Sequence, residues 1–126
     1  MKNKLEIKWA ARVAQKNIAD SEEYLSLVFN RKEVRMAVCE LTKQRGTILR
    51  YKAKDILRAS RTQLLPETNE NVRAEFVKIL NGIPLMPVCL VRKNDTLFIA
   101  DGYHRTCAAY YLSKDAPVHC IVAGLK

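Results

Sequence analysis

The sequence is poor in residues that cross-link, bend or interrupt a chain, with 4 cysteines, 4 glycines and 4 prolines among 126 residues. The cysteines are irregularly spaced and lie in apolar segments, which predicts buried, reduced thiols and excludes a disulfide-stapled mini-protein. They are Cys39, Cys89, Cys107 and Cys120. No apolar run approaches the roughly 20 residues needed to cross a bilayer, and the N-terminus has no hydrophobic signal core. We therefore expect a cytoplasmic protein without a membrane partner.

The chain also lacks repeats, low-complexity tracts and linkers rich in Gly, Ser or Pro. A chain of 126 residues buries about two thirds of its unfolded surface on folding, so it needs no disulfide or structural metal. These features predict one compact domain, in which an N-terminal helical extension (residues 1–46) precedes a core (residues 47–126).

Acidic residues are in the minority, with 13 against 22 basic residues and a formal net charge of +9. Residues 1–63 hold 15 basic and 7 acidic residues, whereas residues 64–126 hold 7 and 6. Such a field attracts nucleic acid, phosphorylated ligands or an acidic protein partner, although basic surfaces also serve solubility. Ten basic residues fall within residues 31–61, namely Arg31, Lys32, Arg35, Lys43, Arg45, Arg50, Lys52, Lys54, Arg58 and Arg61.

Apolar spacing and turn signals predict the order of the elements. Asp20 followed by Glu23 resembles an N-terminal cap and predicts a helix near residues 21–29. The strands at 88–92 and 96–100 flank a short polar turn, which is typical of an antiparallel hairpin. Further helices are expected near 32–45, 53–59, 68–82 and 103–112, and further strands near 47–51 and 117–122. The pattern predicts the α+β class, with a small mixed sheet packed against helices.

The most informative segment runs from an apolar strand through Asp101 and Gly102 into the last predicted helix. The first N–H groups of a helix have no intrahelical acceptor, and with the positive end of the helix dipole they bind anions. Gly102 permits close approach to the backbone, and the side chains of two following residues add donors. We therefore predict a phosphate site formed by Gly102, Tyr103, His104 and Arg105.

These groups alone supply roughly 2–5 kcal/mol, which corresponds to about millimolar affinity for one phosphate. A useful ligand needs a second anchor, which we predict at Arg58, Ser60 and Arg61. Asp101 is expected either to cap the helix or to form with His104 an acid/base or metal-assisting pair. Such a pair would serve phosphoryl transfer, or hydrolysis of a nucleotide or phosphodiester.

The Asp-Gly-Tyr-His-Arg motif, with its flanking strand and helix, resembles the phosphate-binding signature of the ParB/sulfiredoxin-like fold, the ParB-like nuclease domain superfamily. The resemblance covers about residues 47–123 and implies a small stand-alone bacterial member of that fold. It implies that the amides of Gly102 and Tyr103, with the side chains of His104 and Arg105, hold nucleotide phosphates. The Gly-Gly-Cys-His-Arg motif does so in sulfiredoxins.

Departures from the family's motifs exclude some of the activities that the resemblance would otherwise imply. Tyr103 occupies the place of the sulfiredoxin catalytic cysteine and cannot act as a thiolate, so sulfinate reduction is not expected. The Gly-Glu-Arg-Arg and Asn-Pro-Arg segments of ParB are missing, and no helix-turn-helix domain follows. The Asp-Gly-x-His-Arg form resembles that of the fold's free-serine kinases, in which an acidic residue and a His-Arg pair serve phosphoryl transfer.

Mg²⁺ is the cofactor expected with a nucleotide at this turn. No zinc or redox cofactor is expected, although His104, Cys107, His119 and Cys120 superficially resemble zinc ligands. Three functions stay open: a phosphate-binding protein or enzyme at the turn, a non-enzymatic DNA- or RNA-binding module that uses residues 31–61, and a degenerate protein-interaction domain.

Overall fold

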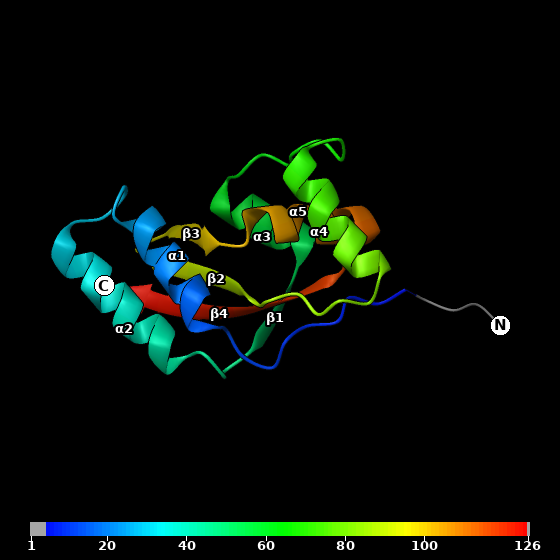
Figure 1. The fold of residues 1–126 in the computed structure, drawn as a ribbon. Helices are drawn as coiled ribbons and strands as arrows, with labels where there is room; N and C mark the ends of the chain where they lie inside the picture. The colour runs from blue at the N-terminus through cyan, green and yellow to red at the C-terminus, as the bar shows by residue number, and fades with distance from the viewer. Residues whose placement is uncertain (1–4, 126) are drawn as a thin grey trace.

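The computed structural model describes residues 5–125. Its helices are α1 (Gln15–Leu25), α2 (Arg31–Lys43), α3 (Ala53–Ser60), α4 (Glu70–Leu80) and α5 (Tyr103–Leu112). Its strands are β1 (Leu49–Lys52), β2 (Val88–Lys93), β3 (Thr96–Asp101) and β4 (Pro117–Leu125). Figure 1 shows the sheet between two groups of helices, with α1 and α2 on one side and α3, α4 and α5 on the other. The predicted α+β class is confirmed.

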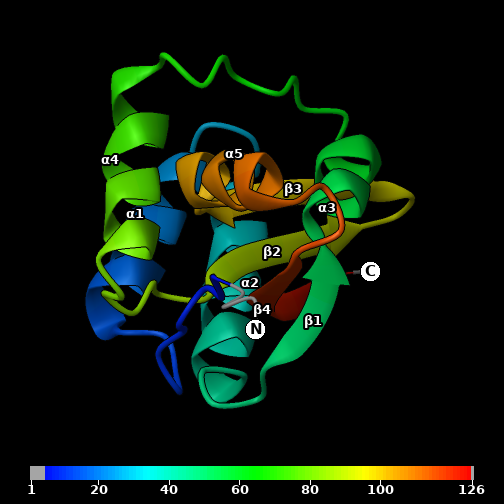
Figure 2. The same ribbon diagram turned by 90° about the vertical axis from the view of Figure 1, so that its right-hand side faces the viewer.

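The four strands form one mixed sheet in the order β1-β4-β2-β3. β2 and β3 are the predicted antiparallel hairpin, and Asn94 in its turn adopts a left-handed conformation with φ 55°. β4 runs parallel to β2 and antiparallel to β1, so the last strand of the chain lies inside the sheet. β1 and β3 are therefore the two edges, and Figure 2 shows β1 at one border of the sheet.

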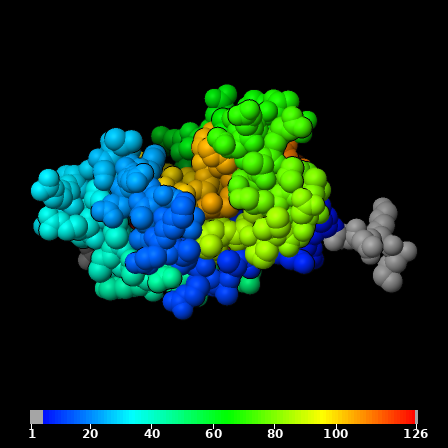
Figure 3. Space-filling view, viewed as in Figure 1, coloured from blue at the N-terminus to red at the C-terminus, as the bar shows by residue number. Residues whose placement is uncertain are grey.

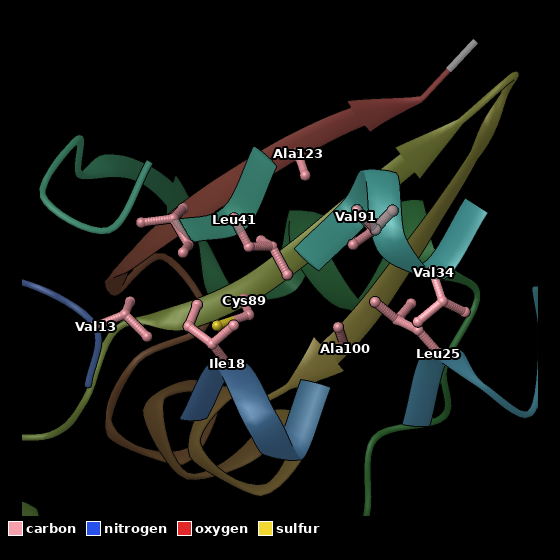
Figure 4. Packing of buried hydrophobic residues seen from close by; sticks show 11 residues of the cluster. Val13, Ile18, Leu25, Val34, Leu41, Cys89, Val91, Ala100 and Ala123 are labelled. Carbon is pink, nitrogen blue, oxygen red and sulfur yellow. The ribbon is translucent and has the colours of Figure 1, made fainter. Parts of the chain in front are cut away.

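Each face of the sheet is covered by its own pair of helices, because successive side chains of a strand point to opposite faces and both sets are apolar. On one face, Cys89 packs with Ile18 and other apolar residues of α1 and α2, as Figure 4 shows. On the other face, Leu90 packs with Ile56 of α3 and Ala109 of α5. A third apolar cluster joins α4 to α5. Burial of one large aliphatic side chain stabilises a fold by about 1.5–3 kcal/mol, so these clusters fix the helices on the sheet.

The first helix departs most from the sequence prediction. α1 begins at Gln15 rather than near residue 21, and Asp20 lies inside the helix instead of capping it. The physical reason is an apolar stripe that starts earlier, at Ile18, and continues through Ser21 and Leu25, all of which are buried. Because Ser21 is polar, the apolar spacing of this helix is interrupted in the sequence, and its true start could not be predicted from that spacing.

The second helix lies close to its predicted position. Asn30 and Glu33 form a capping box at the start of α2, in which each side chain accepts a hydrogen bond from the other residue's backbone N–H. Both α1 and α2 share a hydrophobic cluster with the sheet. The proposed subdivision into residues 1–46 and 47–126 stays a prediction.

The remaining elements lie within a few residues of their predicted places. α5 spans the expected residues 103–112, and α4 begins after Asn69, whose side chain accepts two N–H groups of its first turn. β4 continues to Leu125, beyond the predicted end at residue 122, because it pairs with the whole of β2.

Three of the four cysteines are buried as predicted, but Cys39 is exposed, so the prediction for it is wrong. Cys39 lies on α2, where Val34, Ala37 and Leu41 take the buried side and leave the thiol on the solvent side. None of the helices within residues 5–125 has the length and apolar character needed to span a membrane.

Candidate functional site

The turn between β3 and α5 has the predicted form. β3 ends at Asp101, Gly102 takes the N-cap position with φ 107°, and α5 starts at Tyr103. A Cβ at residue 102 would lie 2.8 Å from Cγ2 of Val88, and few side chains tolerate this φ. Both the backbone conformation and the close packing on β2 therefore require glycine.

The first N–H groups of α5 lack acceptors within the described chain. No side chain caps the helix, and its first backbone bond runs from the N–H of Thr106 to the carbonyl of Gly102. Asp101 does not cap α5, contrary to one reading of the sequence, because other groups hold its carboxylate. The N–H groups of residues 103–105 are therefore available to an anion.

The Asp101 carboxylate ties α1 to the end of β3 and to α5. Its Oδ2 accepts a hydrogen bond from Nδ2 of Asn17 at 2.9 Å and another from Nη2 of Arg105 at 2.9 Å. The side chains of Arg105 and Asp101 are only 14% and 18% exposed. Removal of one partner from a buried ion pair costs about 3–5 kcal/mol, and this partly buried pair approaches that case. Asp101 therefore serves first to fix the arrangement of the turn.

Arg105 folds back along α5 toward Gly102. Its Nη2 lies 2.9 Å from the place that a Cβ at Gly102 would take. Its Nε is buried and has no hydrogen-bond partner among residues 5–125. The guanidinium thus lies beside the turn and keeps one donor unsatisfied.

Tyr103 and His104 complete the first turn of α5. The Tyr103 hydroxyl donates to the carbonyl of Gln63, and burial raises the pKa of Tyr103 above its ordinary value. The His104 ring lies 5.7 Å from the Tyr103 ring, and the His104 residue is partly exposed. Its ring nitrogens make no hydrogen bond to any part of the chain that the structure describes, so they are available to a ligand.

The turn faces a hollow on the surface. Figure 3 shows this hollow between α1 and α4, with gold to orange atoms of the β3–α5 segment on its floor. α1 contributes Asn17 to the turn, and α4 packs on the other side against α5. An anion therefore has access to the start of α5 from this side.

The three residues predicted as a second anchor lie at the C-terminal end of α3, and two of them are engaged there. Arg58 pairs with an acidic side chain one turn earlier, at 3.2 Å, and the Ser60 hydroxyl donates to a carbonyl of its own helix. Arg61 ends α3 with φ 55° and lies two residues before Gln63, whose carbonyl holds Tyr103. Two residues span at most about 7 Å, so of the three Arg61 is the best placed to reach a ligand at the turn.

Two of the four residues that superficially resemble zinc ligands, His119 and Cys120, are engaged in other contacts. His119 stacks on Trp9 with 5.3 Å between ring centroids and accepts a hydrogen bond from Arg50. Burial raises the pKa of Cys107, which makes this thiol a poor nucleophile. Within residues 5–125, no three His, Cys, Asp or Glu side chains are grouped so that they could hold a metal ion.

Two cavities lie elsewhere on the molecule. One of about 700 Å³ lies between residues 5–9 and the start of β4 and is lined by Trp9 and His119. Another of about 370 Å³ lies between α4 and Tyr111. Neither is lined by a residue of the turn, and the sequence analysis predicted neither.

Asn17 is the site residue that the sequence analysis missed. It precedes Asp101 by 84 residues and lies next to the buried Ile18. The available signal was an amide side chain inside a helix beside its apolar stripe, which indicates a buried partner but does not identify it.

Comparisons with models of protein families, with curated proteins and with solved structures found no match for this chain.

Proposed function

We propose that this chain is a small ParB/sulfiredoxin-like protein that binds the phosphates of a nucleotide or nucleic acid at the start of α5. The uncapped first turn of α5 carries the proposal, because its three N–H groups have no acceptor among residues 5–125. The left-handed Gly102 and the guanidinium beside it are further support. The order of strand, Asp-Gly turn and helix supports the family resemblance.

The charge balance of the turn limits how one phosphate is held. Arg105 shares its charge with Asp101, so the N–H groups, the helix dipole and His104 supply most of the attraction. Such a set of donors binds a single phosphate with a Kd of about 1 mM. The ligand therefore carries several phosphates or a further group, which Arg61 is placed to meet.

The reactions open to this site are phosphoryl transfer and hydrolysis of a nucleotide or phosphodiester, with Asp101 and His104 as the acid/base pair. Oδ2 of Asp101 already accepts two hydrogen bonds, so Oδ1 is the oxygen for a substrate proton or for Mg²⁺. Mg²⁺ keeps most of its ligands as water and phosphate oxygens, so it would arrive with the nucleotide. The ring of His104 lies against the Tyr103 ring, and its nitrogens make no hydrogen bond within residues 5–125.

Calorimetric titration of the full chain with nucleoside triphosphates, with and without Mg²⁺, tests the binding. His104→Ala should weaken binding by about 10-fold or more, because it removes a charge-assisted hydrogen bond. Arg105→Lys keeps the charge but loses the planar fork and should also weaken it. Arg92→Ala is the matched control, since Arg92 is exposed near the turn of the hairpin, at the far end of β2 and β3 from Asp101.

Binding that is equal in all four proteins would refute the assignment of the site. Absence of binding by the wild type at millimolar nucleotide would refute the function itself. Thermal melts of each variant separate loss of the site from loss of the fold, which matters for Arg105 because of its ion pair with Asp101. Analysis of the nucleotide after incubation tells binding from turnover.

A nucleic-acid-binding module that uses residues 31–61 is the second candidate. The observation in its favour is that nine of the ten basic residues in this segment are exposed, Arg45 being partly buried. α2 and α3 lie on opposite faces of the sheet, however, so these charges do not share one face. The candidate predicts affinity for duplex DNA that falls steeply with salt, with a slope near −0.9 per phosphate neutralised. Binding that ignores salt would exclude it.

A further inference from the structure

β1 is an edge strand with one open side. Its residues Leu49–Lys52 pair with β4 only, and all four are exposed. The N–H of Ala53 donates to the carbonyl of Ala116, which continues the register of β1 on β4. Pairs in an antiparallel ladder alternate, so Tyr51 and Leu49 direct their backbone groups to β4. The N–H and C=O groups of Arg50 and the N–H of Lys52 therefore point away from the sheet, whereas the C=O of Lys52, the N-cap residue of α3, belongs to the first turn of that helix.

The two faces of this edge differ in chemistry. Leu49 and Tyr51 lie on the α3 side of the sheet and are 41% and 43% exposed. Arg50 and Lys52 lie on the opposite face, beside His119 and Pro117 of β4. A strand added next to β1 would therefore alternate between an apolar and a basic surface.

The apolar side has a small cavity on the inward side of Tyr51, over β4, β2 and β3. A cavity of about 140 Å³ lies beside Tyr51, between α3 and the sheet, and Ile56, Leu90 and Val122 contribute to its wall. Side-chain pockets of this kind give specificity to peptides that add as strands, whereas the main-chain hydrogen bonds give affinity.

The basic side has an excess of positive charge. Arg50, Lys52 and Lys54 are exposed at or just after β1, where Asp115 pairs with Lys52 and Lys54, and Arg50 forms no ion pair within residues 5–125. Arg50 donates a hydrogen bond to His119, and burial and this neighbouring charge lower the pKa of His119, which favours the neutral ring. The charge of Arg50 is therefore not neutralised by an ion pair within residues 5–125, and Lys52 and Lys54 share the single charge of Asp115.

We propose that β1 accepts an extended acidic segment of another protein as a fifth strand of the sheet, with acidic and apolar side chains in alternation. The acidic side chains pair with Arg50 and Lys52, and the apolar ones pack on Leu49 and Tyr51. This interaction is separate from phosphate binding at the start of α5 and does not depend on it. A second copy of the chain is disfavoured as the occupant, because antiparallel pairing of β1 with itself would place cations opposite cations.

Titration of the full chain with a fluorescent, end-blocked peptide of alternating glutamate and valine tests the proposal. We expect saturable binding, and the same peptide with lysine in place of glutamate should bind at least about 10-fold more weakly. Arg50→Glu combined with Lys52→Glu should abolish binding of the glutamate peptide. Arg31→Glu combined with Lys32→Glu is the matched control, because both residues are exposed at the far end of α2.

Backbone pairing is tested with two peptides that leave the protein unchanged. One is N-methylated at every glutamate and the other at every valine, so only one of them loses the N–H groups that face β1. Loss of binding by about 10-fold or more for one peptide, with the other unaffected, supports strand addition. Equal behaviour of the two peptides would overturn it, as would equal binding of the glutamate and lysine peptides.

Two further outcomes would show that β1 pairs with something other than an acidic peptide. If the peptide does not bind and sedimentation shows a dimer that Arg50→Glu with Lys52→Glu dissociates, the edge pairs with a second copy. If the peptide does not bind but a single-stranded oligonucleotide does, and the same double variant loses it, the edge serves nucleic acid. Either result would overturn the acidic-peptide proposal.

Discussion

The side-chain amide of Asn17 donates a hydrogen bond to Oδ2 of Asp101 at 2.9 Å, across 84 residues of sequence. The same oxygen accepts from Arg105, so two donors from two helices hold one carboxylate at the end of β3. α1 is therefore part of the candidate site, although it lies in the segment predicted to be an extension. A fragment limited to residues 47–126 would lack one of these two donors.

Asn17→Ala is expected to lower the free energy of unfolding by about 1.5–3 kcal/mol, the usual worth of a hydrogen bond to a charged group. Urea denaturation followed by circular dichroism measures the change. Asn71→Ala is the control, because Asn71 is exposed on α4 and its replacement should change stability by no more than about 0.5 kcal/mol. Equal stability of the two variants would mean that the Asn17 bond does not support the turn.

Gly102→Ala is expected to destabilise the protein by about 1–3 kcal/mol, because it imposes a φ of 107° on a residue with a Cβ and forces that Cβ against Val88. Gly124→Ala makes the matched comparison. No atom lies within 4 Å of a Cβ at Gly124, and its φ is not positive, so the substitution should be nearly neutral. Thermal melts of both variants measure the difference, and a neutral Gly102→Ala would contradict the observed turn.

One thiol of four should react with Ellman's reagent in the folded protein, because Cys39 is exposed and the other three are buried. All four should react in guanidinium chloride. Cys39→Ser should remove the reaction of the folded state entirely. Rapid reaction of a second thiol in native protein would show that a buried cysteine is accessible.

Stability should fall as the pH rises from about 9 to 11. Burial raises the pKa of Cys89 from 9.0 to about 11, and that of Cys120 to about 12. Below pH 9 each thiol is protonated in both folded and unfolded chains, and the full stability is present. Between pH 9 and the pKa of the folded state only the unfolded chain loses the proton, so the unfolded chain is increasingly favoured as the pH rises. Above the folded pKa both states lose it, and the free energy of unfolding stops falling.

The contribution of Cys89 to this loss is of the order of 2–3 kcal/mol, since two pKa units separate its folded and unfolded states. Urea denaturation at pH 8, 9, 10 and 11 measures it as a difference between wild type and Cys89→Ala, which cancels the titration of lysines and tyrosines. The variant should lose less stability than the wild type over this range. Parallel curves would show that Cys89 ionises as easily in the folded chain as in the unfolded one.

Local signals predicted most of the fold. The period of α4, the hairpin of β2 and β3 and the Asp-Gly turn before α5 each depend on neighbouring residues, and each is confirmed. α1 was misplaced because the buried Ser21 interrupts an apolar stripe whose burial depends on the distant sheet. Cys39 was misassigned because a cysteine beside apolar residues on a helix lies on either face.

The candidate site was predictable only where it is local. The uncapped amides and Gly102 follow from a strand, a turn and a helix in sequence. The ion pair of Asp101 with Arg105 spans one helical turn and is local. The Asp101 carboxylate forms this pair instead of capping α5 partly because Asn17 of α1, distant in sequence, also donates to it. Long-range partners of this kind leave no periodic signal in the sequence.

The position of β4 inside the sheet has a consequence for synthesis. Among the described strands β1 pairs only with β4, and β4 is synthesised after every other described element. Until residues 117–125 have been added, β1 has no strand beside it, although β2 and β3 can already pair with each other. The sheet is therefore complete only after β4 has been synthesised, and a chain that stalls earlier exposes unpaired strand edges that favour aggregation.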